Sequence, residues 1–566
     1  MSKSLQDRRS ELLNRVPSWD PLTLHQWFDK LCEQFGDRPV LISDGVELSY
    51  DHVRRESLDL ARGLVELGVS HGDRVSFLLA NFPEYLPLRI AVSRVGAIAV
   101  PLNFLYRETE LEYVLGQSRT NVLVTMSEFS GIDYLSMLDA IAPGWSEGRQ
   151  TAFPDLREVV VFRTGAPVRS GARTLEDLAT SGRSAGPRAV FPEVSPQDLS
   201  DMFYTSGTTG SPKGVLNTHD GMLRSSFASA LTRGMGEGWK TLFSLPLYHT
   251  FAYTEGVLAP MWVGGSIVPR VKFDAEDYLA GIERFEATEI LAVPTMMVAI
   301  LEAARRTAHD LSSLVSVMSA SAAAPAWVWE RTKELLGNPY IVTAWGMTET
   351  SASCTMTHPE DPIDVHSTTV GAPKLAGPAA DERGQLFHVA TADPVTGELL
   401  PAGTTGELLV SSASVTVGYW EKPEETSKVV REGWLHTGDI ARVDASGRVV
   451  LTGRAKELYK SGGELIMPKE VEELITKIPG VSQAFAIGIP DEFWGEAGCA
   501  VVVTEPGVEL SVEEILEPCR LGLAKFKVPK KVVFMEADEL PTTPTGKIQK
   551  YRLVELVKDG TATGIG

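Results

Sequence analysis

The sequence predicts an α/β protein in which a large N-terminal domain of layered α/β subdomains precedes a small α+β C-terminal domain. Its 566 residues exceed what one compact core usually holds, so two or more domains are expected. Between residues 50 and 350, segments with helical hydrophobic spacing alternate with short β-rich runs. After residues 406–410 this pattern changes to short hairpin-like strands, which are followed by a mixed segment of helices and strands. These observations together predict the two-part architecture.

The alternating part predicts largely parallel sheets covered by helices. We expect helices over residues 58–67, 295–306 and 325–336, and strands over residues 74–80, 290–293 and 314–318. Residues 164–189 are rich in Gly, Ser and Arg and are interpreted as a surface connection. Ligands of such sheets bind at the carboxyl ends of the strands, so functional residues are expected in the loops that follow strands.

The C-terminal part predicts smaller elements. The strands that follow residue 406 indicate a β-barrel-like region, and one of its strands ends at Arg454. Beyond it we expect helices over residues 468–477 and 512–523 and strands over residues 484–489 and 500–504. The predicted domains are therefore residues 1–455 and 456–566, with the boundary at Lys456.

Composition excludes several classes of partner. The chain has 53 Lys and Arg against 74 Asp and Glu, so its formal net charge is −21. Nucleic acid and anionic membrane surfaces are therefore unfavourable partners. The four cysteines form no CxxC pair, which argues against a disulfide framework or a zinc site. The first 20 residues carry no apolar run, and no other segment is long and apolar enough to cross a bilayer. A cytoplasmic protein without an integral membrane segment is expected.

A loop with the composition of a phosphate-binding site follows the predicted strand over residues 202–205. Its glycines permit close backbone approach, its hydroxyls and backbone N–H groups can donate to an anion, and Lys213 adds a positive charge. It is not a Walker A loop, because Lys213 follows proline and precedes glycine rather than opening a helix. The residues expected to bind phosphate are Thr205, Ser206, Gly207, Thr208, Thr209, Gly210 and Lys213.

Residues 204–214, with the sequence YTSGTTGSPKG, resemble the signature of the class I adenylate-forming superfamily. This superfamily includes acyl- and aryl-CoA synthetases, carrier-protein adenylation domains and beetle luciferases. The resemblance extends from about residue 25 to residue 555, with further motifs in the family's order. It implies that the chain activates a carboxylic acid with ATP as an acyl-adenylate and then transfers the acyl group to a thiol, which we take to be coenzyme A.

The resemblance also assigns the rest of the ATP site. Glu349, at a strand end, is a hard oxygen ligand suited to Mg²⁺, with Thr205 as a second ligand. Thr348 is placed at the α-phosphate, and Trp345 and Gly346 at the adenine ring. Asp439 and Arg454 are placed at the ribose, although a buried Asp–Arg pair between hairpins would give the same pattern. Where the family usually has a Gly-Gly-Ala turn under adenine, this chain has Ala322, Ala323 and Ala324, whose methyl groups narrow the nearby acyl site.

In the C-terminal domain the resemblance implies a change of conformation between two half-reactions. Lys547 would stabilise the negative charge that develops as the carboxylate attacks the α-phosphate. The domain would then rotate about Lys456, so that Gly462 and Gly463 give the pantetheine arm room to pass. Lys527 and Trp494 are candidates for binding the phosphates and adenine of CoA, although each is also compatible with a structural role.

The acid itself is only partly constrained. His249 lies in the segment LPLYHTF, which resembles the motif whose histidine gates the acyl site. Residues 252–266 contain no aspartate of the kind that anchors an amino group in amino-acid-activating relatives, and Glu255 is the only acid there. An apolar fatty, alicyclic or aromatic acid is therefore favoured. A ligase that loads an acyl-carrier protein, a luciferase-like oxygenase and a non-catalytic nucleotide-binding protein remain as alternatives, and a homodimer remains open.

Overall fold

The computed structural model describes residues 3–186, 190–205, 212–321, 324–394, 396–454, 457, 459–461, 464–491, 495–505, 507–525, 527–542 and 548–558. The chain divides into two compact units. The larger unit comprises Met1–His388 and Ser411–Leu435, and the smaller comprises Val389–Val410 and His436–Gly566. The strands near residues 389–454 are thus grouped mainly with the C-terminal part, and the domain boundary at Lys456 stays a prediction.

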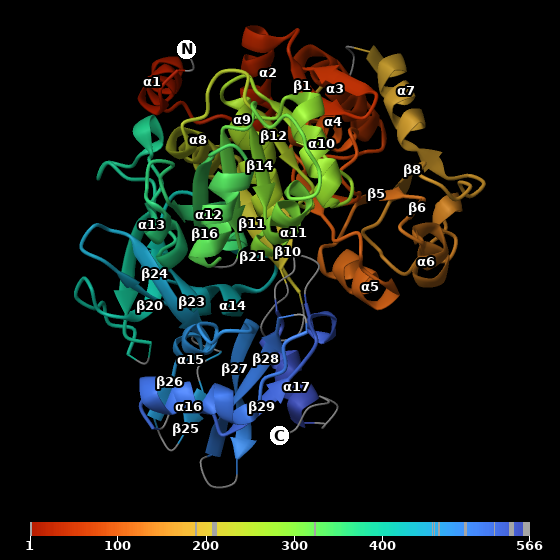
Figure 1. Ribbon diagram of the computed structural model, residues 1–566. Helices are drawn as coiled ribbons and strands as arrows, with labels where there is room; N and C mark the ends of the chain where they lie inside the picture. The colour runs from red at the N-terminus through yellow and green to blue at the C-terminus, as the bar shows by residue number, and fades with distance from the viewer. Residues whose placement is uncertain are drawn as a thin grey trace. The chain divides into compact units, whose positions relative to one another are not determined.

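Two large sheets form the centre of the larger unit (Figure 1). The first has nine strands in the order β18-β17-β16-β15-β14-β12-β13-β1-β2, and the neighbours from β16 to β1 run parallel. Their bounds are β1 Pro39–Ser43, β2 Val46–Ser49, β12 Lys240–Phe243, β13 Ser266–Pro269, β14 Glu289–Ala292, β15 Ser316–Ala320, β16 Tyr340–Met347, β17 Ala352–Met356 and β18 Ala372–Pro373.

The second sheet has eight strands in the order β21-β11-β10-β4-β3-β5-β8-β9, parallel from β10 to β9. Their bounds are β3 Arg74–Leu78, β4 Ile98–Pro101, β5 Val122–Met126, β8 Glu158–Phe162, β9 Arg173–Thr174, β10 Leu199–Thr205, β11 Lys213–Thr218 and β21 Gly418–Tyr419. The strands β6 Glu128–Phe129 and β7 Ile132–Asp133 form a separate hairpin. The prediction of layered, largely parallel α/β structure is confirmed.

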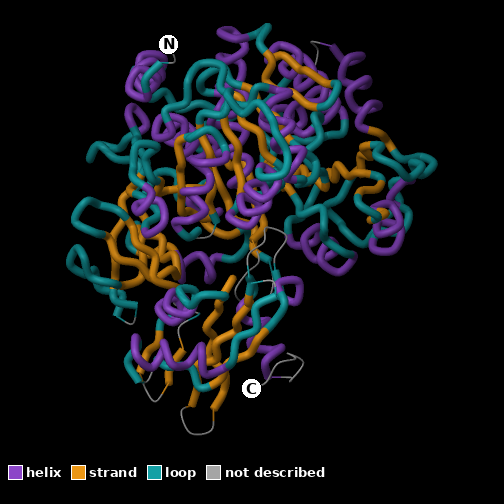
Figure 2. Tube along the Cα trace, viewed as in Figure 1, coloured by secondary structure: helices purple, strands orange, loops and turns teal. Residues whose placement is uncertain are grey.

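Helices surround these strands, as the purple and orange tubes of Figure 2 show. They are α1 Leu5–Arg15, α2 Leu24–Phe35, α3 Tyr50–Glu66, α4 Tyr85–Arg94, α5 Glu108–Gln117, α6 Tyr134–Ile141, α7 Leu175–Ala185, α8 His219–Arg233, α9 Ala259–Met261, α10 Ala275–Phe285, α11 Pro294–Ala304, α12 Ala326–Leu335, α13 Ile363–Thr368 and α14 Pro423–Val429. Shorter elements are the 3₁₀ turns Trp145–Glu147, Thr348–Thr350 and Gly377–Ala379, the π-helix η3 Phe251–Leu258 and the strand β22 Val430–Arg431.

The prediction that residues 164–189 form only a surface connection is wrong. Helix α7 lies within this segment and begins with a capping box, in which Thr174 and Asp177 satisfy each other's backbone N–H groups. It packs so closely on α3 that any side chain at Gly182 would overlap the carbonyl oxygen of Asp59 in α3. The polar composition hid a helix whose apolar face is only a few residues wide.

The smaller unit contains two sheets. In one, β19 His388–Ala392, β20 Gly406–Ser411 and β23 Trp434–Val443 are successive neighbours, and β24 Val449–Arg454 also pairs with β23. Among the described residues this sheet is open, so the predicted barrel-like region does not close. The other sheet has the order β26-β25-β28-β27, with β29 beside β28. Its strands are β25 Tyr459–Ser461, β26 Glu464–Ile466, β27 Val481–Asp491, β28 Gly495–Thr504 and β29 Lys531–Phe534.

Alternation along β28 buries both faces of the second sheet. Ala500 and Val502 belong to a core formed with α15 Pro468–Ile475 and α16 Val512–Gly522. Val501 and Val503 point to the other face, where they join a core formed with α17 Lys550–Lys558. A 3₁₀ turn, Ala537–Glu539, precedes α17. The predicted α+β character of the C-terminal part is confirmed.

The described residues include no helix with both the length and the apolar character needed to cross a membrane. All four cysteines are buried free thiols.

One buried histidine predicts how stability changes with pH. His219 opens α8, is fully buried, and accepts the backbone N–H of Leu24 at its Nδ1, 3.3 Å away. Burial lowers its pKa to about 3. Because the histidine pKa is about 6.5 in the unfolded chain, this side chain is protonated below that pH in the unfolded chain but stays neutral in the folded protein. The stability of the fold is complete above about pH 6.5 and decreases as the pH falls from there towards 3.

We expect this group alone to cost about 1 kcal/mol between about pH 7.5 and about pH 5.5. Asparagine at this position keeps an acceptor for Leu24 and does not titrate. His219→Asn should therefore reduce the pH dependence of the unfolding free energy, measured by urea denaturation, by about that amount. His52→Asn, at an exposed histidine of α3, should leave it unchanged. An unaltered pH dependence in His219→Asn would contradict the assignment.

Candidate active site

The predicted phosphate loop connects two strands of a hairpin. Strands β10 and β11 are antiparallel, and Thr205 and Lys213 are directly opposed at its end. Residues 206–211, which include the predicted Ser206, Gly207, Thr208, Thr209 and Gly210, lie outside the described residues. Lys213 opens a strand and not a helix, which confirms that the loop is not of the Walker A type.

Lys213 is held by residues that lie far away in the sequence. Its Nζ is 2.6 Å from Oε2 of Glu425 in α14 and 5.1 Å from the ring centre of Tyr419 in β21. Only 8% of Lys213 is exposed. The hydrogen bonds from Lys213 and Lys428 lower the pKa of the Glu425 carboxyl to about 2. The lysine is therefore fixed at the mouth of the loop by a carboxylate that stays ionised.

Tyr419 also binds Glu349, which follows β16 in a 3₁₀ turn. The Tyr419 hydroxyl donates to Oε1 of Glu349 at 2.8 Å, and burial together with this carboxylate raises the pKa of Tyr419. The Glu349 backbone carbonyl accepts the N–H of Thr416 at 2.7 Å, and the Thr348 carbonyl accepts the Asn217 amide at 3.2 Å. The structure thus brings the predicted phosphate lysine and the predicted metal carboxylate to the same tyrosine.

Tyr419 and Glu425 were missed in the sequence. The triplet Gly418-Tyr419-Trp420 after a run of small β-forming residues could have indicated an aromatic side chain at a strand end. Glu425 gives no such signal, because acidic residues are abundant in this chain.

The residues predicted around adenine lie near β15 and β16. Trp345 is 8% exposed on β16, and at Gly346 any side chain would overlap the carbonyl oxygen of Ala352 on the neighbouring strand β17. Ser321, which directly follows β15, has a φ of 77°, a backbone conformation that non-glycine residues adopt rarely. Ala324 is buried, and Ala322 and Ala323 lie outside the described residues.

His249 lies two residues before the π-helix η3. Its ring is 4.4 Å from the ring of Tyr248, and burial lowers its pKa to about 4, so the imidazole is neutral at physiological pH. Single π-helical turns are rare and occur frequently at functional sites. The segment therefore has the local geometry expected of a specialised site.

Glu255, the acid that follows His249 in the sequence, is committed to a buried ion cluster. It is fully buried and accepts hydrogen bonds from Ser229 at 3.0 Å, from Arg233 at 3.2 Å and from Ser353. The Nζ of Lys374 lies 3.9 Å away. These partners use the carboxylate within the fold, which removes it as an anchor for a substrate amine.

Two predicted ribose residues are opposed in the smaller unit. Asp439 on β23 and Arg454 on β24 are paired across the sheet, with Nε 2.9 Å from Oδ1. Asp439 is buried and Arg454 is exposed. Their pairing agrees both with a ribose site and with the structural alternative.

The remaining predictions lie elsewhere in the smaller unit. The Nζ of Lys527 is 2.6 Å from Oε1 of Glu470 in α15. No group of three or more His, Cys, Asp or Glu side chains is arranged to hold a metal ion in the described part of the chain. The predicted residues outside that part are Lys456, Gly462, Gly463, Trp494 and Lys547.

Two family models and several relatives match this chain. The model described as AMP-binding enzyme matches residues 28–420, and the model of the AMP-binding enzyme C-terminal domain matches residues 470–547. The (7a-methyl-1,5-dioxo-octahydro-1H-inden-4-yl)propanoyl:CoA ligase of Mycobacterium tuberculosis is 34% identical over 95% of this chain and 99% of its own length. A feruloyl-CoA synthase from an Amycolatopsis species is 33% identical over 89% of this chain and 93% of its own length.

A solved structure agrees with these relatives. The anthranilate CoA ligase AuaEII, in complex with anthranoyl-AMP, aligns with a TM-score of 0.81 and 26% identity over 99% of this chain and 100% of its own. The family models alone cover well over half of the sequence. The chain therefore belongs to the AMP-binding enzyme family and is an AMP-forming acid–CoA ligase.

Proposed function

We propose that the enzyme activates an uncharged, apolar carboxylic acid, whether fatty, alicyclic or aromatic, to acyl-AMP with release of pyrophosphate, and then forms the CoA thioester. The observation that carries this choice is the burial of Glu255 in its ion cluster, six residues after the predicted acyl gate His249. Because Arg233 and Lys374 already compensate the charge of this carboxylate, it would not serve to neutralise a substrate ammonium. The names of the relatives, which refer to an alicyclic propanoyl and a feruloyl group, support the same class.

In the adenylation step the loop residues and Lys213 would bind the ATP phosphates. Thr348 would bond the α-phosphate, Trp345 would cover adenine above Ala322–Ala324, and Asp439 and Arg454 would bind ribose. Glu349 and Thr205 would hold Mg²⁺, which would neutralise phosphate charge when bound. A single carboxylate with a hydroxyl fits this ion, because Mg²⁺ usually takes few protein ligands and completes its shell with phosphates and water. Lys547 would stabilise the charge that develops during attack.

The second step, thioester formation, would require the C-terminal domain to rotate about the predicted hinge residue Lys456. Rotation of residues 456–566 would remove Lys547 and bring Gly462 and Gly463 to the thiol path, with Lys527 and Trp494 holding CoA. We place this reaction in the cytoplasm. A carrier protein as the acyl acceptor is the alternative, and it predicts acyl-AMP formation without consumption of CoA.

The proposal predicts strong discrimination within a matched pair of acids. 3-Phenylpropanoate and L-phenylalanine differ only in an α-ammonium group. An unpaired charge in a buried apolar site costs several kcal/mol, so kcat/KM for L-phenylalanine should be lower by a factor of about 10²–10³. The measurement is release of pyrophosphate and formation of acyl-CoA from octanoate, 3-cyclohexylpropanoate, cinnamate and this pair.

Equal activation of L-phenylalanine would contradict the apolar acyl site. Release of pyrophosphate without acyl-CoA would favour the carrier-protein alternative. No release from any acid would favour a non-catalytic nucleotide-binding protein.

A further inference from the structure

We infer that Asn81 and Tyr85 are positioning residues for His249, and that they thereby control how tightly the acid is bound. Asn81 lies in the connection between β3 and α4, and Tyr85 is the first residue of α4. Both belong to the second sheet and its helices. They hold the segment of residues 245–249, which follows β12 of the first sheet. This inference rests on the proposed function, because it takes His249 to lie at the acyl site.

The Asn81 side chain makes the backbone hydrogen bonds that a neighbouring strand would otherwise make to residues 245–247. Residues 244–250 belong to no strand, so their backbone polar groups need other partners if they are buried. The Asn81 amide nitrogen donates to the carbonyl of Leu245 at 3.0 Å, and its oxygen accepts the N–H of Leu247 at 3.1 Å. The same nitrogen donates to the carbonyl of Arg270, which follows β13, at 3.1 Å. Asn81 is 2% exposed, so one amide links the carboxyl ends of three strands away from water.

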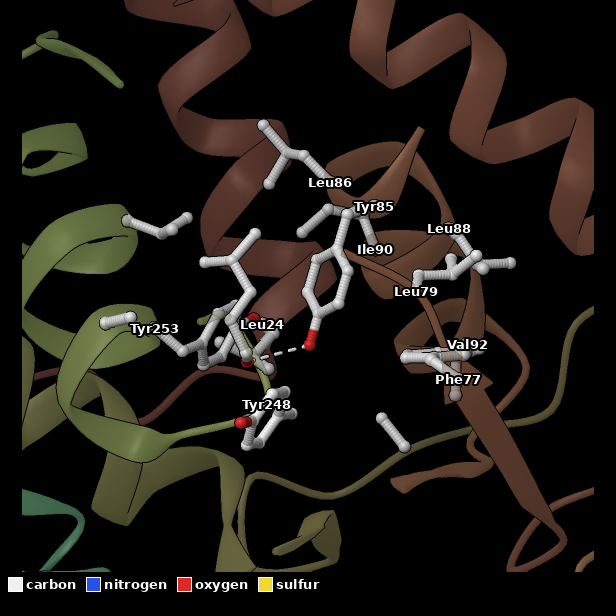
Figure 3. Packing of buried hydrophobic residues seen from close by; sticks show 14 of the residues in the cluster. Leu24, Phe77, Leu79, Tyr85, Leu86, Leu88, Ile90, Val92, Tyr248 and Tyr253 are labelled. Atoms are coloured by element: carbon white, nitrogen blue, oxygen red, sulfur yellow. Dashed lines mark hydrogen bonds between the residues drawn. The ribbon is translucent and has the colours of Figure 1, made fainter. Parts of the chain in front are cut away.

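Tyr85 completes the contact on the other side of Leu247. Its hydroxyl donates to the Leu247 carbonyl at 2.9 Å, and the residue is 2% exposed. Figure 3 shows the Tyr85 side chain directed from α4 towards the region of Tyr248 and Tyr253, with its hydrogen bond drawn as a dashed line. Both backbone polar groups of Leu247 are thus bound by side chains from residues 81–85.

The chain on the far side of His249 is also fixed. The His249 carbonyl accepts the N–H of Tyr253, which lies within the π-helix η3. Two residues after Tyr253, Glu255 is bound by Arg233, whose Nη2 also donates to the Glu255 backbone carbonyl at 2.9 Å. His249 therefore stands between the Asn81–Tyr85 brace and a buried ion cluster. The cluster holds the helix that follows His249, and the brace holds the backbone that precedes it.

The test compares two buried tyrosines whose hydroxyl groups donate to carbonyl groups in different segments of the chain. Tyr50 is fully buried and donates to the Gly265 carbonyl at 2.7 Å, away from residues 245–249. Tyr85→Phe and Tyr50→Phe each remove one buried hydroxyl bond and should lower thermal stability similarly. We expect only Tyr85→Phe to raise KM for the best acid of the panel, by about fivefold, with KM for ATP unchanged in both. Equal KM values for the acid in the two variants would overturn the inference.

A double-mutant cycle tests whether the brace acts through His249. Asn81→Ala should lower kcat/KM for the acid by about a hundredfold in the wild type, because a small misplacement of a side chain that positions the substrate is costly. In the His249→Ala background it should add less than about twofold. Independent, additive losses would show that Asn81 supports the fold and not the histidine.

Hydrogen–deuterium exchange of residues 245–250 separates this inference from the proposed function. The brace predicts faster exchange of these amides in Tyr85→Phe and Asn81→Ala than in Tyr50→Phe, with no acid present. If exchange accelerates but the wild type activates no acid, the proposed function fails, and with it the link to acid binding. If the wild type is active but exchange in this segment is the same in all variants, the brace alone is overturned.

Discussion

Lys547→Ala is expected to lower the rate of acyl-AMP formation by about 10²–10³-fold, while thioester formation from supplied acyl-AMP stays within a few-fold of wild type. The carboxylate that attacks the α-phosphate brings one negative charge towards another, and the bridging oxygens gain more charge in the transition state. An ammonium placed there stabilises the transition state more than the bound substrates, which is the condition for raising kcat. In thioester formation the thiol attacks the acyl carbon and AMP leaves, so no carboxylate approaches the α-phosphate and this charge repulsion does not arise.

The two half-reactions are measured separately. Pyrophosphate release reports adenylation, and acyl-CoA formed from synthetic acyl-AMP reports the thiol step. Lys477→Ala removes an exposed cation in the same unit and should change neither rate. Equal loss of both half-reactions in Lys547→Ala would contradict a lysine that serves only the first step.

The sequence predicted those parts of the molecule that depend on local pattern. The hydrophobic alternation over residues 290–336 corresponds to β14, α11, β15 and α12, each within about two residues of its expected ends. Lys213 was singled out by the composition of its loop, and Glu349 by the resemblance of its motif to the adenylate-forming superfamily. In these cases the required information lies within about ten neighbouring residues.

The missed features depend on contacts between distant residues. Lys213 and Glu425 are 212 positions apart, and Asn81 is 166 positions from Leu247. No local periodicity reports such pairs. Helix α7 was missed for a related reason, since its packing on α3 depends on Gly63 and Gly182, where any side chain would collide with the opposite helix. In the sequence, Gly182 and the other glycines of residues 164–189 favoured a loop.

Glu349→Gln is the substitution with the second large expected effect. Glutamine keeps the side-chain volume and an Oε1 acceptor for the Tyr419 hydroxyl, which lies 2.8 Å from Oε1 of Glu349 in the structure. It removes the negative charge. A carboxylate that helps to hold Mg²⁺ against the phosphates loses most of its value when neutral. We therefore expect acyl-AMP formation to fall by about a hundredfold and the Mg²⁺ concentration for half-maximal rate to rise. Thioester formation from supplied acyl-AMP should change little.

Tyr419→Phe is the matched control, because it removes the hydrogen bond and leaves the charge of Glu349 in place. Loss of one hydrogen bond to a charged group should slow adenylation by about tenfold without altering the Mg²⁺ requirement. Initial rates of pyrophosphate release at a series of Mg²⁺ concentrations distinguish the two substitutions. If Tyr419→Phe raised the Mg²⁺ requirement as much as Glu349→Gln, the position of the carboxylate would matter more than its charge, and Glu349 would orient the phosphate loop through Tyr419 instead of holding the ion.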